Sequence, residues 1–173
     1  MPGLENYRAL LLRIDEMCSQ TATRFAAQIS CRPGCDACCR HLSIFAVEAA
    51  ALQRALRHLN EQQAEVIRQA AAASASSPDS PCPLLQGGLC LLYQARPIIC
   101  RTHGLPLLIE RDGAREIDFC PENFRDTASI PGSAVIDLDR LNATLAAINT
   151  LFVHSFPGPE RLTMAQALLR LSD

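Results

Sequence analysis

Cysteine is the residue type in this sequence whose number and spacing could do chemistry: nine cysteines stand in a chain of 173 residues. Eight of them form two groups, one in the segment CRPGCDACC at 31–39 and one spread over 82–120. Persistent disulfides are rare in a reducing cytosol, so clustered cysteines there indicate metal or redox chemistry. Thiolates hold both zinc and iron–sulfur centres. We therefore expect an iron–sulfur cluster or zinc as the cofactor, with eight ligands: Cys31, Cys35, Cys38, Cys39, Cys82, Cys90, Cys100 and Cys120.

The first group has the spacing of a metal knuckle. Cys35 and Cys38 form a C-x-x-C step, which lets one tight turn direct two thiolates at one ion. Cys31 lies one short turn earlier and adds a third thiolate. Cys38 and Cys39 are adjacent in the chain, and neighbouring side chains usually point in different directions. The two thiolates therefore fit better on different metals, or with one of them supporting a cluster from outside its ligand shell.

Each cysteine group is better completed by the other. Adjacent cysteines make the first group a poor tetrahedral cage, and the second group is spread too widely to organise a site by itself. We expect at least one metal centre to take ligands from both groups, joining Cys35 and Cys38 to one or more of Cys82, Cys90 and Cys100. The alternative is two self-contained sites, because local four-cysteine sites are common for zinc.

Two enzyme classes use similar cysteine spacings, and both are disfavoured. The run C-x-x-x-C-x-x-C at 31–38 has the spacing found in radical SAM enzymes, but their barrel core needs roughly 200 residues or more. Residue 37 is also Ala, where that class prefers an aromatic side chain. A thioredoxin-type motif should follow a strand and open a helix, whereas here a helical pattern precedes it.

Several residues near the cysteines have simpler roles. Cys18 lies on an apolar stripe at seven-residue intervals and is expected to be a small buried hydrophobe. Eight cysteines already fill two four-ligand sites, which disfavours His103 as a ligand. A thiolate centre is anionic, so neighbouring arginines would stabilise it; ordinary surface positions are the alternative for each of Arg40, Arg96 and Arg101. No catalytic residue can be named from the sequence.

The elements that must position these residues are mostly helical. Apolar periodicity predicts helices over 4–29, 47–59, 137–154 and 163–171, with a further helix from a cap at Asn60 to about residue 73. Asp112-Gly113 predicts a hairpin between strands at 107–110 and 116–119, and Gly87-Gly88 and Arg96-Pro97 predict turns. Residues 74–83 are rich in Ser and Pro and predict a linker or surface loop. The expected fold is mainly α with a small β-hairpin region and cysteine-rich loops between helices, as one domain over 1–173 with a core at 31–120 and flanking helices at 4–29 and 137–171.

Composition excludes several classes of protein. Lys and Arg number 16 against 18 Asp and Glu, a net charge of -2, so the chain lacks the basic character of a nucleic-acid binder. No apolar run approaches the roughly 18 residues of a membrane span. Charged residues occupy the place of a signal-peptide core. We expect a cytoplasmic protein that binds neither nucleic acid nor membrane.

The two cysteine segments together resemble the YkgJ-type cysteine-cluster family, a CxxCxxCC domain described as zinc- or iron-chelating. The resemblance covers about residues 31–120, and His41 departs from it, since that family more often has an apolar or small residue there. It rests on these features: Cys35, Cys38, Cys39, the helix with Glu48, Cys82-Pro83, Gly88, Cys90, Tyr93, Arg96-Pro97 and Cys100-Arg101. The resemblance implies metal chelation without a settled reaction. Similar domains occur in flagellin lysine N-methylases, but this chain has no glycine-rich loop after a strand for S-adenosylmethionine.

The expected function is therefore metal binding, as an accessory, carrier or sensor with a metal ion and a possible protein partner. One alternative is an enzyme component that uses the cluster for redox chemistry or methyl transfer. The other is a helical interaction module in which zinc only holds the loops together. A deep pocket beside the metal would favour the enzyme, and a colourless zinc protein would favour the module.

Overall fold

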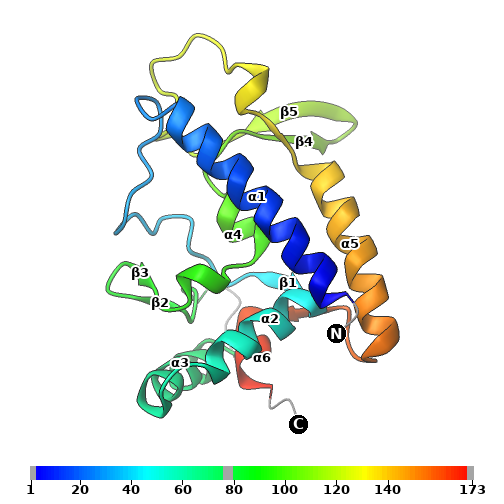
Figure 1. Cartoon of the computed structure of the whole chain (residues 1–173). Coiled ribbons are helices and arrows are strands. Elements are labelled where there is room, and N and C mark those ends of the chain that lie inside the picture. The colour runs from blue at the N-terminus through cyan, green and yellow to red at the C-terminus, as the bar shows by residue number, and fades with distance from the viewer. Residues whose placement is uncertain (1–2, 76–79, 171–173) are drawn as a thin grey trace.

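The computed structural model describes residues 3–75 and 80–170 (Figure 1). The helices are α1 (Leu4–Arg24), α2 (Ala46–Arg57), α3 (Glu61–Ser74), α4 (Ile98–Thr102), α5 (Leu138–Ser155) and α6 (Met164–Leu169), with 3-10 turns at η1 (Tyr93–Ala95) and η2 (Gly132–Ala134). The strands are β1 (Ser43–Phe45), β2 (Leu85–Gln86), β3 (Leu89–Cys90), β4 (Leu107–Arg111), β5 (Ala114–Asp118), β6 (Ile136–Asp137) and β7 (Arg161–Thr163).

The helices form a frame around α2. This helix packs against α1, α5 and α6, and α3 packs on α6. Its side chains Val47 and Leu52 are completely buried, as are Ile67 of α3 and Ala165 of α6. These residues belong to one continuous apolar cluster that extends into α1 and α5, so apolar burial is what holds the helices together.

The strands make three small sheets in the described part of the chain. β4 and β5 form a hairpin whose turn residues Asp112 and Gly113 have φ of 54° and 78°, the left-handed values that a two-residue turn of type I′ requires. β6 runs parallel to β4, and β1 pairs antiparallel with β7. β2 and β3 form a second hairpin, with Leu85 opposite Cys90.

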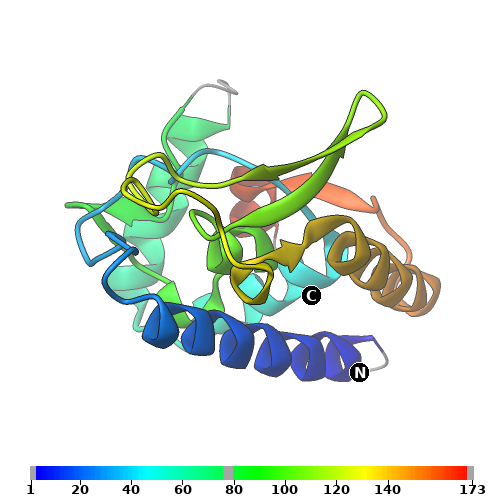
Figure 2. The same ribbon diagram turned by 90° about the horizontal axis from the view of Figure 1, so that it is seen from above.

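The cysteine-bearing segments lie together at one end of the molecule. Figures 1 and 2 both place the loop after α1 beside the β2–β3 hairpin, while the β4–β5 hairpin extends away from α1. The loop and the hairpin are in backbone contact, because a Cβ on Gly88 would lie 3.5 Å from the Cα of Gly34. The helical frame therefore places the first cysteine group beside the hairpin that ends at Cys90, while Cys100 lies in α4.

The expected helices are present, with shifted ends. α1 ends at Arg24 instead of residue 29, and α6 ends at Leu169 instead of 171. The predicted cap of α3 is confirmed, since the Asn60 side chain accepts a hydrogen bond from the backbone N–H of Gln63 (2.9 Å). Both hairpin turns are also confirmed. The predicted linker at 74–83 falls partly on residues 76–79, which lie outside the described residues.

The expected fold class needs a correction. About half of the chain is helical and about 15% is in strands, so the fold is mixed α and β and not mainly α with one hairpin region. The unexpected strands β1, β6 and β7 have only two or three residues each, too few for an alternating apolar pattern to reveal them. Within residues 3–75 and 80–170, no helix has the length and apolar character needed to cross a bilayer.

Candidate metal centre

A backbone bridge connects the two cysteine groups. Arg40 and Pro81 pair in an antiparallel bridge. In that register Cys39, the residue before Arg40, stands opposite Cys82, the residue after Pro81. The chain then turns at once, because the N–H of Leu85 donates to the carbonyl of Cys82 (2.9 Å), and the hairpin returns to Cys90. Residues from distant parts of the chain are thus placed next to each other.

Four thiols lie close enough to affect one another electrostatically; we call Cys39, Cys82, Cys90 and Cys100 the half-buried thiol group. Burial raises the pKa of Cys82 to about 11 and that of Cys100 to about 12. Thiolate charge on Cys90 and Cys39 further raises the pKa of Cys82, and charge on Cys82 and Cys90 further raises that of Cys100. Burial raises the pKa of Cys39 as well, followed by the charge of Cys90. These shifts keep the metal-free thiols protonated at neutral pH.

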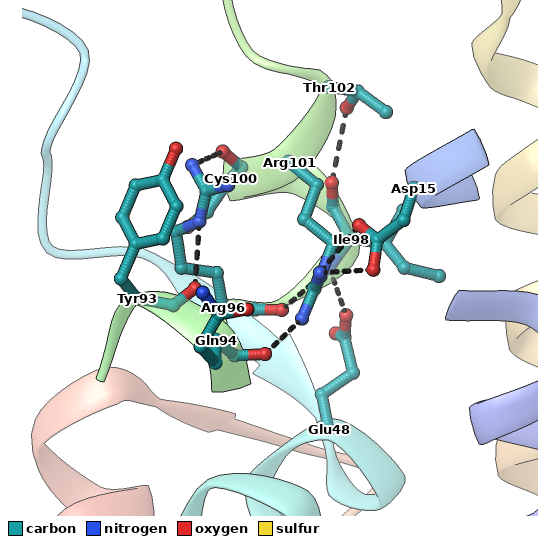
Figure 3. Close-up of polar contacts among 9 residues, drawn as sticks. All are labelled: Asp15, Glu48, Tyr93, Gln94, Arg96, Ile98, Cys100, Arg101 and Thr102. Carbon is teal, nitrogen blue, oxygen red and sulfur yellow. Dashed lines mark hydrogen bonds and ion pairs between the residues drawn. The ribbon is translucent and has the colours of Figure 1, made fainter. Parts of the chain in front are cut away.

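Arg96 is the cation that faces this group. Its charge lowers the pKa of Cys39, Cys90 and Cys100, opposing the effect of burial. The guanidinium stacks on the ring of Tyr93 at 3.6 Å from the ring centre and donates to the carbonyl oxygens of Tyr93 (3.0 Å) and Cys100 (3.2 Å) (Figure 3). Arg96 is therefore held in place by the same loop that carries two of the thiols.

Arg101 fixes the loop to α1. Its Nη1 donates to both carboxylate oxygens of Asp15, at 2.5 and 2.7 Å, and its side chain is only 7% exposed. Nη2 and Nε donate to the carbonyl oxygens of Gln94 (2.5 Å) and Arg96 (2.8 Å) (Figure 3). Arg40, the third arginine singled out in the sequence, is exposed. Arg96 is thus the arginine that the described geometry directs at the thiols, while Arg101 joins the backbone around them.

The side chain of Glu48 connects the chain after the first cysteine group to the helix that carries Cys100. This side chain is buried, and one carboxylate oxygen accepts from the backbone N–H of Phe45 at 3.0 Å. The other accepts from the backbone N–H of Ile98, also at 3.0 Å (Figure 3). The first bond caps α2, which follows the first cysteine group, and the second caps α4, which carries Cys100. Burial raises the pKa of Glu48, and the two hydrogen bonds oppose that rise. Sequence reasoning placed Glu48 on a helix but gave it no role.

Cys31 is anchored beside Cys120 by a buried amide. Asn123 is completely buried; its Nδ2 donates to the carbonyl of Gly104 (2.6 Å) and to Cys31 Sγ (3.4 Å). Its Oδ1 accepts from the N–H of Ser30 (2.8 Å). A Cβ on Gly104 would lie 3.2 Å from Cys31 Sγ and 3.5 Å from Cys120 Cβ. Cys31 and Cys120 therefore pack against the same glycine, and no sequence pattern indicated Asn123.

Replacing Gly104 by alanine is expected to destabilise the protein. Gly104 has φ of +87°, which strains any residue with a Cβ, and the added methyl would displace Cys31. We expect a loss of about 1–3 kcal/mol in the free energy of unfolding, measured by urea denaturation. Gly132→Ala is the matched control, since its Cβ would meet open space and its φ is not positive. Equal stability of the two variants would show that the Cys31–Cys120 contact is not tight.

The donor set fits a zinc or iron centre, although the thiols are not yet in ligand positions. All nine cysteines are free. Across residues 3–75 and 80–170, no three His, Cys, Asp or Glu side chains are already arranged to hold an ion. Soft thiolates from separate loops are the ligands that zinc and iron–sulfur centres use. Binding would have to remove the thiol protons and draw the sulfurs together.

Between the two groups, Cys39 interacts electrostatically with Cys82 and Cys90, and Cys31 lies next to Cys120. The charges that act on Cys38 come from Cys39, Cys31 and Cys35, all within the first group. The sequence prediction that Cys35 and Cys38 share an ion with the second group stays a prediction.

Both histidines near the cysteines have other surroundings. His41 Nε2 accepts from the backbone N–H of Ala165 (3.2 Å) at the start of α6. His103 follows the last residue of α4, and burial lowers its pKa. His41, which departs from the resemblance, thus contributes to joining the segment after the first cysteine group to α6.

Cys18 packs against the apolar cluster, as its stripe position predicts. Burial, followed by the charge of Asp15, raises its pKa to about 11. We expect Cys18→Ala to leave the metal content unchanged and to cost about 1 kcal/mol of stability. Elemental analysis and urea denaturation check the two expectations. Loss of metal from this variant would make Cys18 a ligand and contradict its assignment to the core.

Free thiols on loops between packed helices define a cysteine-rich metal-binding class of protein. The chain belongs to the CxxCxxCC family, whose model matches residues 30–121, just over half of the chain, and is described as a "Putative zinc- or iron-chelating domain". The match spans both cysteine groups and confirms the resemblance noted in the sequence. No curated protein and no solved structure matches the chain.

Proposed function

We propose that the protein binds zinc or an iron–sulfur cluster through Cys39, Cys82, Cys90 and Cys100, and that it acts as an accessory, carrier or sensor. The observation that carries the proposal is the bridge between Arg40 and Pro81. It sets Cys39 against Cys82 although the two are far apart in the chain. Bringing thiols together in this way has a cost in chain entropy, which an ion bound between them offsets.

The surroundings of the half-buried thiol group suit an anionic centre. Four thiolates on Zn²⁺ give the site a charge of about -2, and a four-thiolate cluster has a similar charge. Arg96 lies beside three of these thiols and is partly shielded from water, so its charge offsets part of theirs. Bound metal would supply the remaining positive charge and deprotonate the thiols.

Two surface hollows lie beside α1 and α3. One is lined by residues of α1 and η2, among them Met17, Gln20 and Ser133. The other lies between α3 and the β2–β3 region, among Leu59, Val66 and Leu91. Neither of these two hollows is lined by a cysteine, and the accessory, carrier or sensor role therefore rests on the thiols themselves.

Elemental analysis of protein prepared without oxygen tests the proposal. We expect stoichiometric zinc in a colourless protein, or iron with acid-labile sulfide in a brown one. Cys90→Ser is expected to lower the metal content, and Cys18→Ala is the matched control because its thiol is partly buried and packs against the apolar cluster. Wild-type protein without bound metal, or an unchanged metal content in Cys90→Ser, would contradict the proposal.

A further inference from the structure

Of the eight candidate ligands, the four outside the half-buried thiol group include all three that are exposed. Cys31, Cys35 and Cys38 are exposed, and Cys120 is partly buried. We call these four the outer thiol group. Three of them belong to one nine-residue loop, and the fourth comes from the segment after β5. Any ion held by this group would therefore be reachable from solution.

Two consecutive backbone turns shape the loop that carries the outer thiols. The N–H of Cys35 donates to the carbonyl of Arg32 (3.0 Å), and the N–H of Cys39 donates to the carbonyl of Asp36 (2.8 Å). Cys35 therefore ends one turn, and Cys38 lies inside the next. Such turns are how metal knuckles direct successive thiolates toward one ion.

The far side of the outer group is fixed to the body of the protein. Asn123 holds Cys31 through its Nδ2 while bonding to Ser30 and Gly104 on either side. Cys120 packs against Gly104, as Cys31 does, and its backbone N–H donates to the carbonyl of Gly104 (3.3 Å). Cys31 and Cys120 are thus held in position before any ion binds, which lowers the entropy cost of binding one.

The adjacent pair Cys38 and Cys39 divides the two groups. Cys39 is placed opposite Cys82 by the bridge at Arg40 and is partly buried. Cys38 is exposed, and the neighbouring thiols of its own loop are Cys31 and Cys35. Cys38 lies inside the turn that precedes the bridge, with its thiol next to that of Cys39, and we assign it to the group of its own loop.

We propose that Cys31, Cys35, Cys38 and Cys120 form a second centre for a thiophilic divalent cation, open to solvent, which exchanges its ion faster than the half-buried thiol group does. This proposal rests on the function proposed above for the half-buried group. The protein would then hold one resident ion and one exchangeable ion, separated by the Cys38–Cys39 peptide. Solvent access is a main control of how readily a bound metal is reached.

Zinc release to a colorimetric chelator tests this division. The full chain is stripped of metal, loaded with Zn²⁺ alone, and mixed with excess chelator. We expect about two Zn²⁺ per chain, since a tetrahedral ion takes four thiolates, released in two phases of equal amplitude whose rates differ by about tenfold or more. Cys35→Ser and Cys120→Ser should each abolish the fast phase and preserve the slow one. Cys90→Ser should do the reverse.

The other outcomes are distinguishable. A single ion whose release is altered alike by Cys35→Ser and Cys90→Ser would overturn the second centre while leaving metal binding intact. Two ions released at one rate would show that the outer centre does not exchange its ion faster than the half-buried thiol group does. A fast phase that survives Cys120→Ser would remove Cys120 from the site. Failure of the chain to retain any Zn²⁺ would instead overturn the proposed function itself.

Discussion

Removing the metal is expected to release the two cysteine segments while the packed helices persist. Bound ions offset the cost of bringing thiols together. Residues 31–39 have no buried side chain to replace that contribution, and in 82–120 the thiols lie between core residues such as Leu84 and Ile98. α2, α3 and α6 are held by completely buried residues such as Leu52, Ile67 and Ala167. Structural zinc contributes about 10 kcal/mol or more to the folding of small zinc domains, so the effect on the loops should be large.

Hydrogen exchange followed by mass spectrometry measures this effect. Peptides from both cysteine segments should exchange at least about a hundredfold faster after metal removal, since each 1.4 kcal/mol of lost protection is a factor of ten. Peptides from α3 and α6 should change little and serve as internal controls. Unchanged protection of both cysteine segments in the stripped protein would mean that the loops fold without metal.

Glu48→Ala is expected to cause the largest loss of stability among single substitutions outside the cysteines. It would leave the N–H groups of Phe45 and Ile98 without their acceptors, and the Ile98 bond is fully buried. A hydrogen bond to a charged group contributes about 1.5–3 kcal/mol, so we expect a loss of about 3 kcal/mol in urea denaturation. Glu48→Gln should lose roughly half as much, because its amide keeps one oxygen acceptor.

Glu65→Ala is the matched control, since that side chain is exposed on α3 and accepts surface hydrogen bonds from Arg68 and Gln69. It should denature close to wild type. If Glu48→Ala does the same, the buried carboxylate does not hold the two helix starts together.

The pH dependence gives a second readout for Glu48. Burial raises its pKa in the folded protein above that of the unfolded chain. As pH rises, the unfolded chain loses this proton first, so the contribution of Glu48 is greatest at low pH and declines through the folded-state pKa. Glu48→Gln removes this titration. The stability difference between wild type and Glu48→Gln should therefore narrow as the pH rises from about 4.

Local sequence patterns were sufficient for most helices and turns. Asn60 caps α3 and Asp112-Gly113 forms its turn because each depends on a few neighbouring residues. The cysteine groups were also evident from their spacing. What the sequence could not supply were contacts between distant segments: the bridge of Arg40 with Pro81, the pairing of β1 with β7, and the bond from Ile98 to Glu48.

The proposed division of the thiols into two groups also depends on contacts that the sequence does not show. Adjacency of Cys38 and Cys39 indicated that they reach different metals or that one supports a cluster from outside its ligand shell, and the choice depends on tertiary contacts. Asn123 is a further example, since an isolated asparagine in a loop has no distinguishing pattern, and its bonds to Cys31 and Gly104 appear only in the folded chain.

X-ray absorption spectroscopy at the zinc edge tests the central claim most directly. Zn²⁺-loaded Cys35→Ser would retain the half-buried thiol group as its complete four-thiolate site. We expect four sulfur ligands at about 2.3 Å, from Cys39, Cys82, Cys90 and Cys100. A zinc shell made of nitrogen and oxygen, or one that keeps four sulfurs when Cys90 is also replaced by serine, would contradict the assignment of these four cysteines as the metal ligands.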